Sequence, residues 1–119
     1  MKASRVLFLS VLLFCAGLTP LLLLAQVLAG YTKVGSVTTT TYVDSTVTSG
    51  QVWSYYVTAT NLAGESQPSN IVTAVTPTTT GTHSNTLTWT ASAGATGYNI
   101  YRSQVTVPNP PGALGVTSN

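Results

Sequence analysis

The chain has 119 residues and few charges, since Asp, Glu, Lys and Arg make up only 5% of it, where roughly a quarter is usual. Its formal charge of +2 comes from Lys2 and Arg5, because Lys33 and Arg102 are balanced by the only two acidic residues. No basic stripe is present that would contact phosphates, so the composition argues against nucleic-acid binding.

The first 29 residues have the pattern of an export signal. Lys2 and Arg5 precede a long apolar run, and Val27 and Ala29 occupy positions −3 and −1 of a cleavage site before Gly30. We therefore expect a secretory signal peptide over residues 1–29. The alternative is an uncleaved anchor, because the run approaches the roughly 20 residues that span a bilayer. In either case the predicted leader is a helix.

Residues able to bind metals or form disulfides are scarce. Cys15 is the only cysteine and lies inside the leader, so no disulfide is predicted. One histidine and no cysteine beyond the leader provide too few ligands for zinc. Two separate carboxylates make a poor calcium site. We expect no metal and no cofactor.

After the leader, short alternating segments predict a chain made only of β-strands. Aromatic and β-branched residues recur with a period of two, which is typical of half-buried strands. In this pattern Trp53, Tyr55 and Val57 share one inward face. Pro77 and Gly81 mark residues 76–83, with His83 at their end, as a loop or linker. The predicted strands cover residues 31–37, 42–47, 52–60, 71–75, 86–90 and 98–102.

Several of these segments resemble a bacterial fibronectin type III domain. Residues 50–61, Gly64-Glu65-Ser66 and Ser69-Asn70 are similar to its strand F, F–G loop and strand G. Leu87-Thr-Trp-Thr-Ala-Ser92 resembles strand B, and Gly97-Tyr-Asn-Ile-Tyr-Arg-Ser103 resembles strand C. Residues 31–47 resemble strands C′ and E. The resemblance implies an all-β, immunoglobulin-like β-sandwich. Trp53 stands where the family places the tyrosine of its tyrosine corner, which puts that hydrogen bond in doubt.

The strands follow one another in an unusual order. The family order is A, B, C, C′, E, F, G, whereas this chain runs C′, E, F, G, B, C. One interpretation is a single permuted sandwich over residues 30–103, as a monomer or as a strand-exchanged dimer. The other is two truncated neighbouring repeats. The Pro- and Gly-rich tail, residues 104–119, contains a segment that resembles strand A and could return as an edge strand.

Two tyrosines are the candidate binding residues. Tyr56 and Tyr101 have the opposite parity from the inward residues, so we expect them on the outer face of neighbouring strands. Exposed aromatic side chains often anchor interfaces. The alternative is a cross-strand pair that shields the sheet.

Together with the predicted signal peptide, the resemblance implies a non-catalytic, exported module that binds, adheres or acts as a spacer at a cell surface. Its ligand would be a protein or a polysaccharide. A second hypothesis is a small hydrolase, which requires His83 within hydrogen-bond reach of a hydroxyl and a carboxylate. A third is a fragment of a larger tandem-repeat surface protein or carbohydrate-active enzyme, without an independent role.

Overall fold

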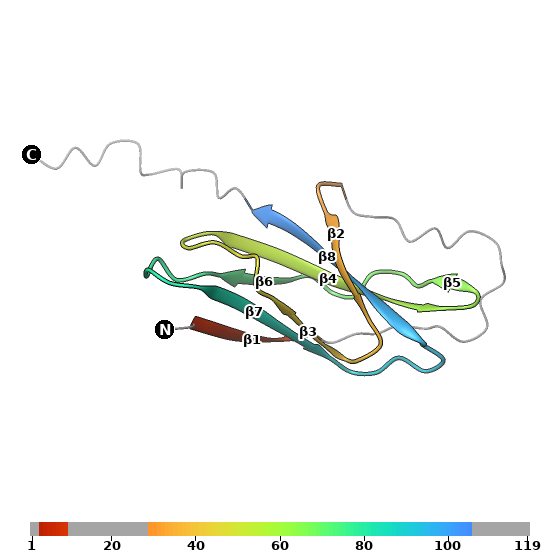
Figure 1. Ribbon diagram of the computed structural model, residues 1–119. Coiled ribbons are helices and arrows are strands. Elements are labelled where there is room, and N and C mark those ends of the chain that lie inside the picture. Colours follow the sequence, from red (N-terminus) through yellow and green to blue (C-terminus); the bar gives the residue numbers. More distant parts are fainter. Residues whose placement is uncertain (1–2, 10–28, 106–119) are drawn as a thin grey trace, which may run out of the picture.

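The protein is described by a computed structural model that covers residues 3–9 and 29–105, in which every regular element is a β-strand (Figure 1). The predicted all-β class is therefore confirmed. The strands are β1 (Ala3–Leu9), β2 (Thr32–Val37), β3 (Thr41–Asp44), β4 (Val52–Asn61), β5 (Gly64–Glu65), β6 (Val72–Val75), β7 (His83–Trp89) and β8 (Gly97–Val105).

The strands form two sheets, as expected for a β-sandwich. The first has the order β1-β7-β3, and the second has the order β2-β8-β4-β5, with β6 also paired to β4. Strands β4 and β8 pair antiparallel from Val52 opposite Val105 to Thr60 opposite Gly97. Strand β3 pairs antiparallel with β7. In both sheets, strands that precede the 76–82 loop are thus hydrogen-bonded to strands that follow it.

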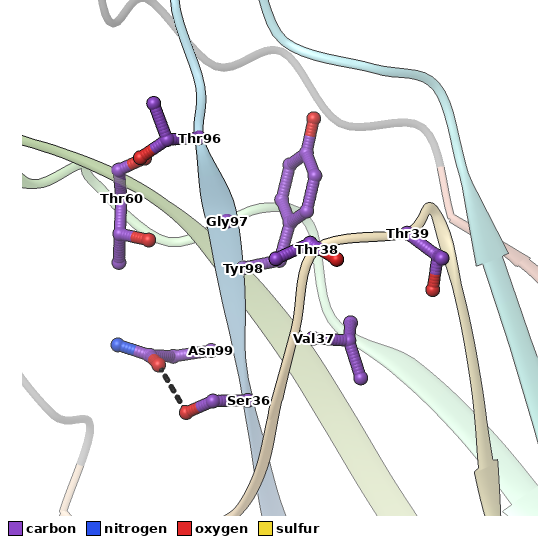
Figure 2. A pocket seen from close by; sticks show the side chains of 9 residues that line it. All are labelled: Ser36, Val37, Thr38, Thr39, Thr60, Thr96, Gly97, Tyr98 and Asn99. Atoms are coloured by element: carbon purple, nitrogen blue, oxygen red, sulfur yellow. Dashed lines mark hydrogen bonds between the residues drawn. The ribbon is translucent and has the colours of Figure 1, made fainter.

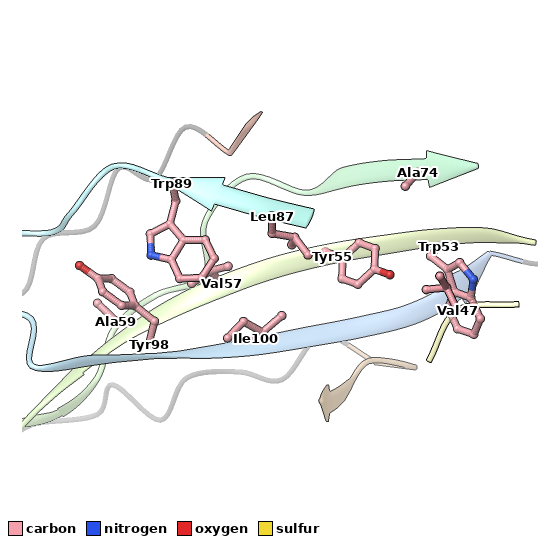
Figure 3. Packing of buried hydrophobic residues seen from close by; sticks show 10 residues of the cluster. All are labelled: Val47, Trp53, Tyr55, Val57, Ala59, Ala74, Leu87, Trp89, Tyr98 and Ile100. Carbon is pink, nitrogen blue, oxygen red and sulfur yellow. The ribbon is translucent and has the colours of Figure 1, made fainter. Parts of the chain in front are cut away.

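A hydrophobic core lies between the sheets (Figure 3). Leu87 and Trp89 of β7 belong to the same buried cluster as Tyr55 and Val57 of β4. Alternation places these side chains on inward faces, and Leu87 is fully buried. Burying one such side chain stabilises the fold by about 1.5–3 kcal/mol. The two halves of the chain therefore share one core, which is the arrangement expected of one closed domain.

The segment between β5 and β6 continues the hydrogen bonding of β4 through two serine side chains. The hydroxyls of Ser66 and Ser69 accept hydrogen bonds from the backbone N–H groups of Ala59 and Val57, at 2.8 and 2.9 Å. The backbone N–H groups of the same serines donate back to the carbonyls of Ala59 and Val57. Pro68, which has no N–H to donate, is thereby tolerated beside a central strand.

Gly35 allows β2 to approach β3 closely. A Cβ at this position would lie 2.5 Å from Cε2 of Tyr42, so the tyrosine ring occupies the space of the missing side chain. The Tyr42 hydroxyl also donates to the carbonyl of Val34 at 2.9 Å. The register between β2 and β8 shifts between Lys33 and Gly35.

The predicted leader helix is not what the structure shows at residues 3–9. Strand β1 pairs in parallel with β7 along its whole length, from Ala3 opposite His83 to Leu9 opposite Trp89. Short apolar runs do not distinguish a strand from a helix by hydropathy alone. Pairing satisfies the backbone groups on the edge of β7 that faces away from β3. The remainder of the leader, residues 10–28, lies outside the described residues.

Two further boundaries differ from the prediction. His83 was placed in the 76–83 loop, but it is the first residue of β7 and its side chain is buried. Strand β8 continues past Ser103 to Val105, into the segment assigned to the tail. Residues 106–119, including the segment expected as an edge strand, lie outside the described residues. In the described structure β1 is the edge strand next to β7.

Candidate functional site

Tyr56 and Tyr101 lie directly opposite each other on β4 and β8. Their rings stack with centroids 4.7 Å apart and an interplanar angle of 12°. The ring of Tyr31 packs against Tyr56 at 5.0 Å. Both candidate residues are absent from the core cluster between the sheets, in agreement with their predicted parity. Their exposed fractions are only 1% and 5%, however, so this pair offers little surface for direct contact.

Glu65 extends this tyrosine cluster on the same face of the sheet. Its Oε1 accepts hydrogen bonds from the hydroxyls of Tyr101, at 2.7 Å, and Thr58. Burial alone would raise the pKa of Glu65, but hydrogen bonds from Thr58, Asn99 and Tyr101 outweigh it and lower that pKa. Burial and the neighbouring Glu65 carboxylate raise the pKa of Tyr101. These groups therefore stay a carboxylate and a neutral phenol at ordinary pH.

The second carboxylate, Asp44, lies at the centre of a polar network between the sheets. Its Oδ2 accepts hydrogen bonds from Arg102 Nη1 at 2.6 Å and from the Tyr55 hydroxyl at 2.9 Å. Its Oδ1 accepts bonds from the backbone N–H and the hydroxyl of Thr46. Asn85 donates to the Tyr55 hydroxyl at 2.9 Å. The hydrogen-bond donors to both oxygens of this carboxylate are therefore backbone and side-chain groups of the protein.

The environment of Asp44 determines its ionisation. Burial acts to raise its pKa, yet the hydrogen bonds from Thr46, Arg102 and Tyr55 lower it overall. Burial and the nearby carboxylate raise the pKa of Tyr55. The guanidinium of Arg102 also lies 4.1 Å above the ring of Trp53, a cation–π geometry. The network joins β3 and β7 of one sheet to β4 and β8 of the other.

His83 lacks the partners that a hydrolytic site requires. Its Nε2 lies 3.0 Å from the backbone carbonyl of Thr79. Its Nδ1 is buried and has no hydrogen-bond partner among the described residues. The two carboxylates bond to other groups, Asp44 within the sandwich and Glu65 on the outer face. The structure therefore does not bring together the histidine, hydroxyl and carboxylate that the hydrolase hypothesis needs.

A trough that the sequence pattern did not predict lies at the end of the second sheet (Figure 2). Its volume is about 590 Å³, within the roughly 300–1,000 Å³ common for ligand sites. Gly97 lies opposite Thr60 across the strand pair. The sequence feature that could have indicated this trough is the run of threonines at residues 38–41 together with Gly97 at the start of β8. We call it the threonine trough. Its hydroxyl-bearing lining residues are Ser36, Thr38, Thr39, Thr60, Thr96 and Tyr98, of which Tyr98 already accepts a hydrogen bond from the backbone N–H of Ser92.

The threonine trough contains space because Gly97 has no side chain. A Cβ there would lie 3.0 Å from Thr60 Oγ1 and 3.3 Å from the carbonyl oxygen of Val37. On one side, the hydroxyl of Ser36 donates to Asn99 Oδ1 at 2.7 Å (Figure 2). Among the residues that the structure describes, no charged side chain lines the trough.

Two further findings concern residues 3–9 and 29–105. Within these ranges there is no group of three or more His, Cys, Asp or Glu side chains that could hold a metal ion. The same residues include no helix long and apolar enough to cross a membrane.

Comparisons with protein-family models, curated proteins and solved structures found no significant match to this chain. Its function is accordingly inferred from the pairing of its strands and the geometry of its side chains.

Proposed function

We propose that the chain is an exported, non-catalytic module of the fibronectin type III kind, which binds a ligand or acts as a spacer at the cell surface. The observation that carries this proposal is the pairing of strands. The first sheet, β1-β7-β3, has the family's neighbours B and E if β7 is strand B and β3 is strand E. The second sheet, β2-β8-β4-β5, has the family's order C′, C, F if β2, β8 and β4 are these strands. Strands β5 and β6 along β4 take the place of strand G.

The engagement of the ionisable groups also supports a binding or spacer role. Asp44 and Arg102 form an ion pair with N···O at 2.6 Å, in which Asp44 is 1% exposed. Glu65 bonds to Tyr101 and Thr58. Groups held in this way stabilise the sandwich and are poorly placed to take up or release protons during catalysis, which requires a free group within reach of a substrate.

Export has a structural consequence for the first sheet. Cleavage before Gly30 would remove β1, so the exported chain would present an unpaired edge of β7. Exposed edge strands readily pair with another chain, which is a physical basis for the strand-exchanged dimer. Sedimentation of the exported chain distinguishes this dimer from the monomer.

Expression of the full chain in a bacterial host tests the proposal. The expected result is recovery from the extracytoplasmic fraction with an N-terminus at Gly30, and one cooperative thermal transition. The variant Lys2→Glu/Arg5→Glu should stay in the cytoplasm, whereas the matched control Lys33→Glu should be exported normally. A cytoplasmic wild-type chain contradicts the export proposal, and a broad, non-cooperative transition favours the fragment alternative.

A further inference from the structure

We propose that the threonine trough binds a neutral, hydroxyl-rich ligand, namely a carbohydrate chain. This inference rests on the proposed function as a binding module and adds the site and the chemical class of its ligand. Three properties of the trough support it: the charge of the lining, its hydrogen-bonding capacity and its shape.

The lining excludes ligands that are recognised through charge. The lining residues in the described part of the chain include no Lys, Arg, Asp or Glu, whereas sites for phosphate or carboxylate groups commonly use Arg or Lys. Neither acidic residue of the described sheets is part of the lining: Asp44 pairs with Arg102, and Glu65, which lies behind the lining residue Asn99, bonds to Asn99 and Tyr101. A neutral ligand is therefore the class that this surface accommodates without an unpaired charge.

The hydroxyls of the trough present both acceptors and donors. Thr96 Oγ1 donates to the carbonyl of Thr60, and Thr39 Oγ1 donates to the carbonyl of Thr41. Each of these oxygens, like that of Ser36, retains lone pairs for a ligand O–H. The hydroxyl of Thr38 makes no hydrogen bond within the described part of the chain, so it can donate. A sugar hydroxyl is itself both donor and acceptor and matches this mixture.

Threonine also suits the apolar parts of a sugar. Each side chain carries a methyl group beside its hydroxyl, so the walls can contact the C–H faces of a pyranose ring while bonding its O–H edges. Thr38 and Thr39 in the β2–β3 turn lie across the trough from Thr60 and Thr96, with Gly97 between them (Figure 2). This places hydroxyls on two opposite walls.

Titration of the ¹⁵N-labelled full chain with defined oligosaccharides tests the inference. The probes are neutral hexasaccharides of glucose, xylose, mannose and galactose, with an oligogalacturonate of equal length as the charged comparison. We expect saturable amide shifts at Thr38, Thr96 and Gly97 with at least one neutral hexasaccharide, and a response at least tenfold weaker with the oligogalacturonate.

Two exposed threonines provide matched variants. Thr38→Arg places a long charged side chain over the trough and should weaken binding tenfold or more. Thr73→Arg makes the same change on β6, whose residue 73 pairs with Ser54, six positions along β4 from Thr60. It should change affinity less than twofold. Thr96→Val, which removes a hydroxyl at nearly constant volume, should weaken binding by a smaller factor.

Three results would overturn the inference: no saturable shift with any neutral hexasaccharide, shifts centred on the tyrosine cluster, or equal losses in the two arginine variants. None of these results bears on export. If the chain reaches the extracytoplasmic fraction but binds no oligosaccharide in the trough, the proposed location stands and only the carbohydrate site is contradicted. A chain retained in the cytoplasm contradicts the proposed function whatever the titration shows.

Discussion

The two faces of strand β4 carry neighbouring tyrosines in very different surroundings. Tyr55 points between the sheets, where its hydroxyl bonds to Asp44 and Asn85. Tyr56 points to the outer face, where its ring stacks on Tyr101. Both are almost completely buried, at 0% and 1% exposed. Alternation along a strand therefore tells which residues share a face, but it does not tell how much of that face meets solvent.

The largest effect is expected from a cavity at the inner face. Leu87→Ala removes a fully buried side chain from the core that both halves of the chain share. The free energy of unfolding should fall by about 3 kcal/mol, measured by urea denaturation. Val43→Ala, on the neighbouring strand β3 but 53% exposed, should change it by less than about 0.5 kcal/mol. Equal effects of the two variants would contradict the shared core.

Loss of the buried anion should have a comparable cost. Asp44→Asn leaves the guanidinium of Arg102, whose side chain is 16% exposed, without its counter-ion. We expect the free energy of unfolding to fall by about 3 kcal/mol, at the lower end of values for broken buried pairs. The double variant Asp44→Asn/Arg102→Met should recover part of this loss. A double variant that loses the sum of both single effects would show that the pair is not coupled.

Removal of single hydroxyls compares the two faces directly. Tyr55→Phe deprives buried Asp44 and Asn85 of a partner and should cost about 2 kcal/mol. Tyr101→Phe removes one hydrogen bond to the half-buried Glu65 and should cost about 1 kcal/mol. Denaturant midpoints of both variants measure the difference. The opposite ranking would mean that the outer tyrosine cluster stabilises the fold more than the inner network does.

The smallest effect is the pH dependence that Glu65 contributes. Its pKa is lowered from 4.5 in the folded chain, so its contribution to stability is complete above that value and is lost as the pH falls through the lower, folded-state pKa. The free energy of unfolding should therefore differ between wild type and Glu65→Gln near pH 6, by less than about 1 kcal/mol for this partly exposed group. The difference should shrink towards pH 3. A difference that grows as the pH falls would contradict the direction of the shift.

Much of the fold could be predicted because the alternation of apolar residues along each segment matches the face of the strand that is buried in the structure. The alternation of Trp53, Tyr55 and Val57 identified the inward face of β4, and Leu87 and Trp89 joined the same core. The secondary structure of the leader was harder to predict, because a short apolar run such as residues 3–9 is compatible with a helix or a strand. In the structure these residues form a strand through their pairing with β7. That pairing depends on residues some eighty positions away, which no local pattern reveals.

The candidate sites show a different limit. The outward parity of Tyr56 and Tyr101 was predicted, with a cross-strand pair as the alternative to a contact surface. The extent of their burial could not be predicted, because it depends on Tyr31 and on the register of β4 with β8. The threonine trough arises from residues of β2, β4 and β8 and the loops beside them. Gly97 became informative only once Thr60 was known to lie opposite it. A site assembled from three separate segments leaves no spacing in the sequence that identifies it.

The most direct test of the proposed fold is whether the segments before and after the 76–82 loop share one core within one molecule. Nuclear Overhauser contacts in the full chain, with Leu87 methyl groups and Tyr55 and Val57 selectively labelled, measure this. A shared core predicts contacts from Leu87 to both residues in a sample that sedimentation shows to be monomeric. Absence of these contacts, or their appearance only between differently labelled chains, would contradict it.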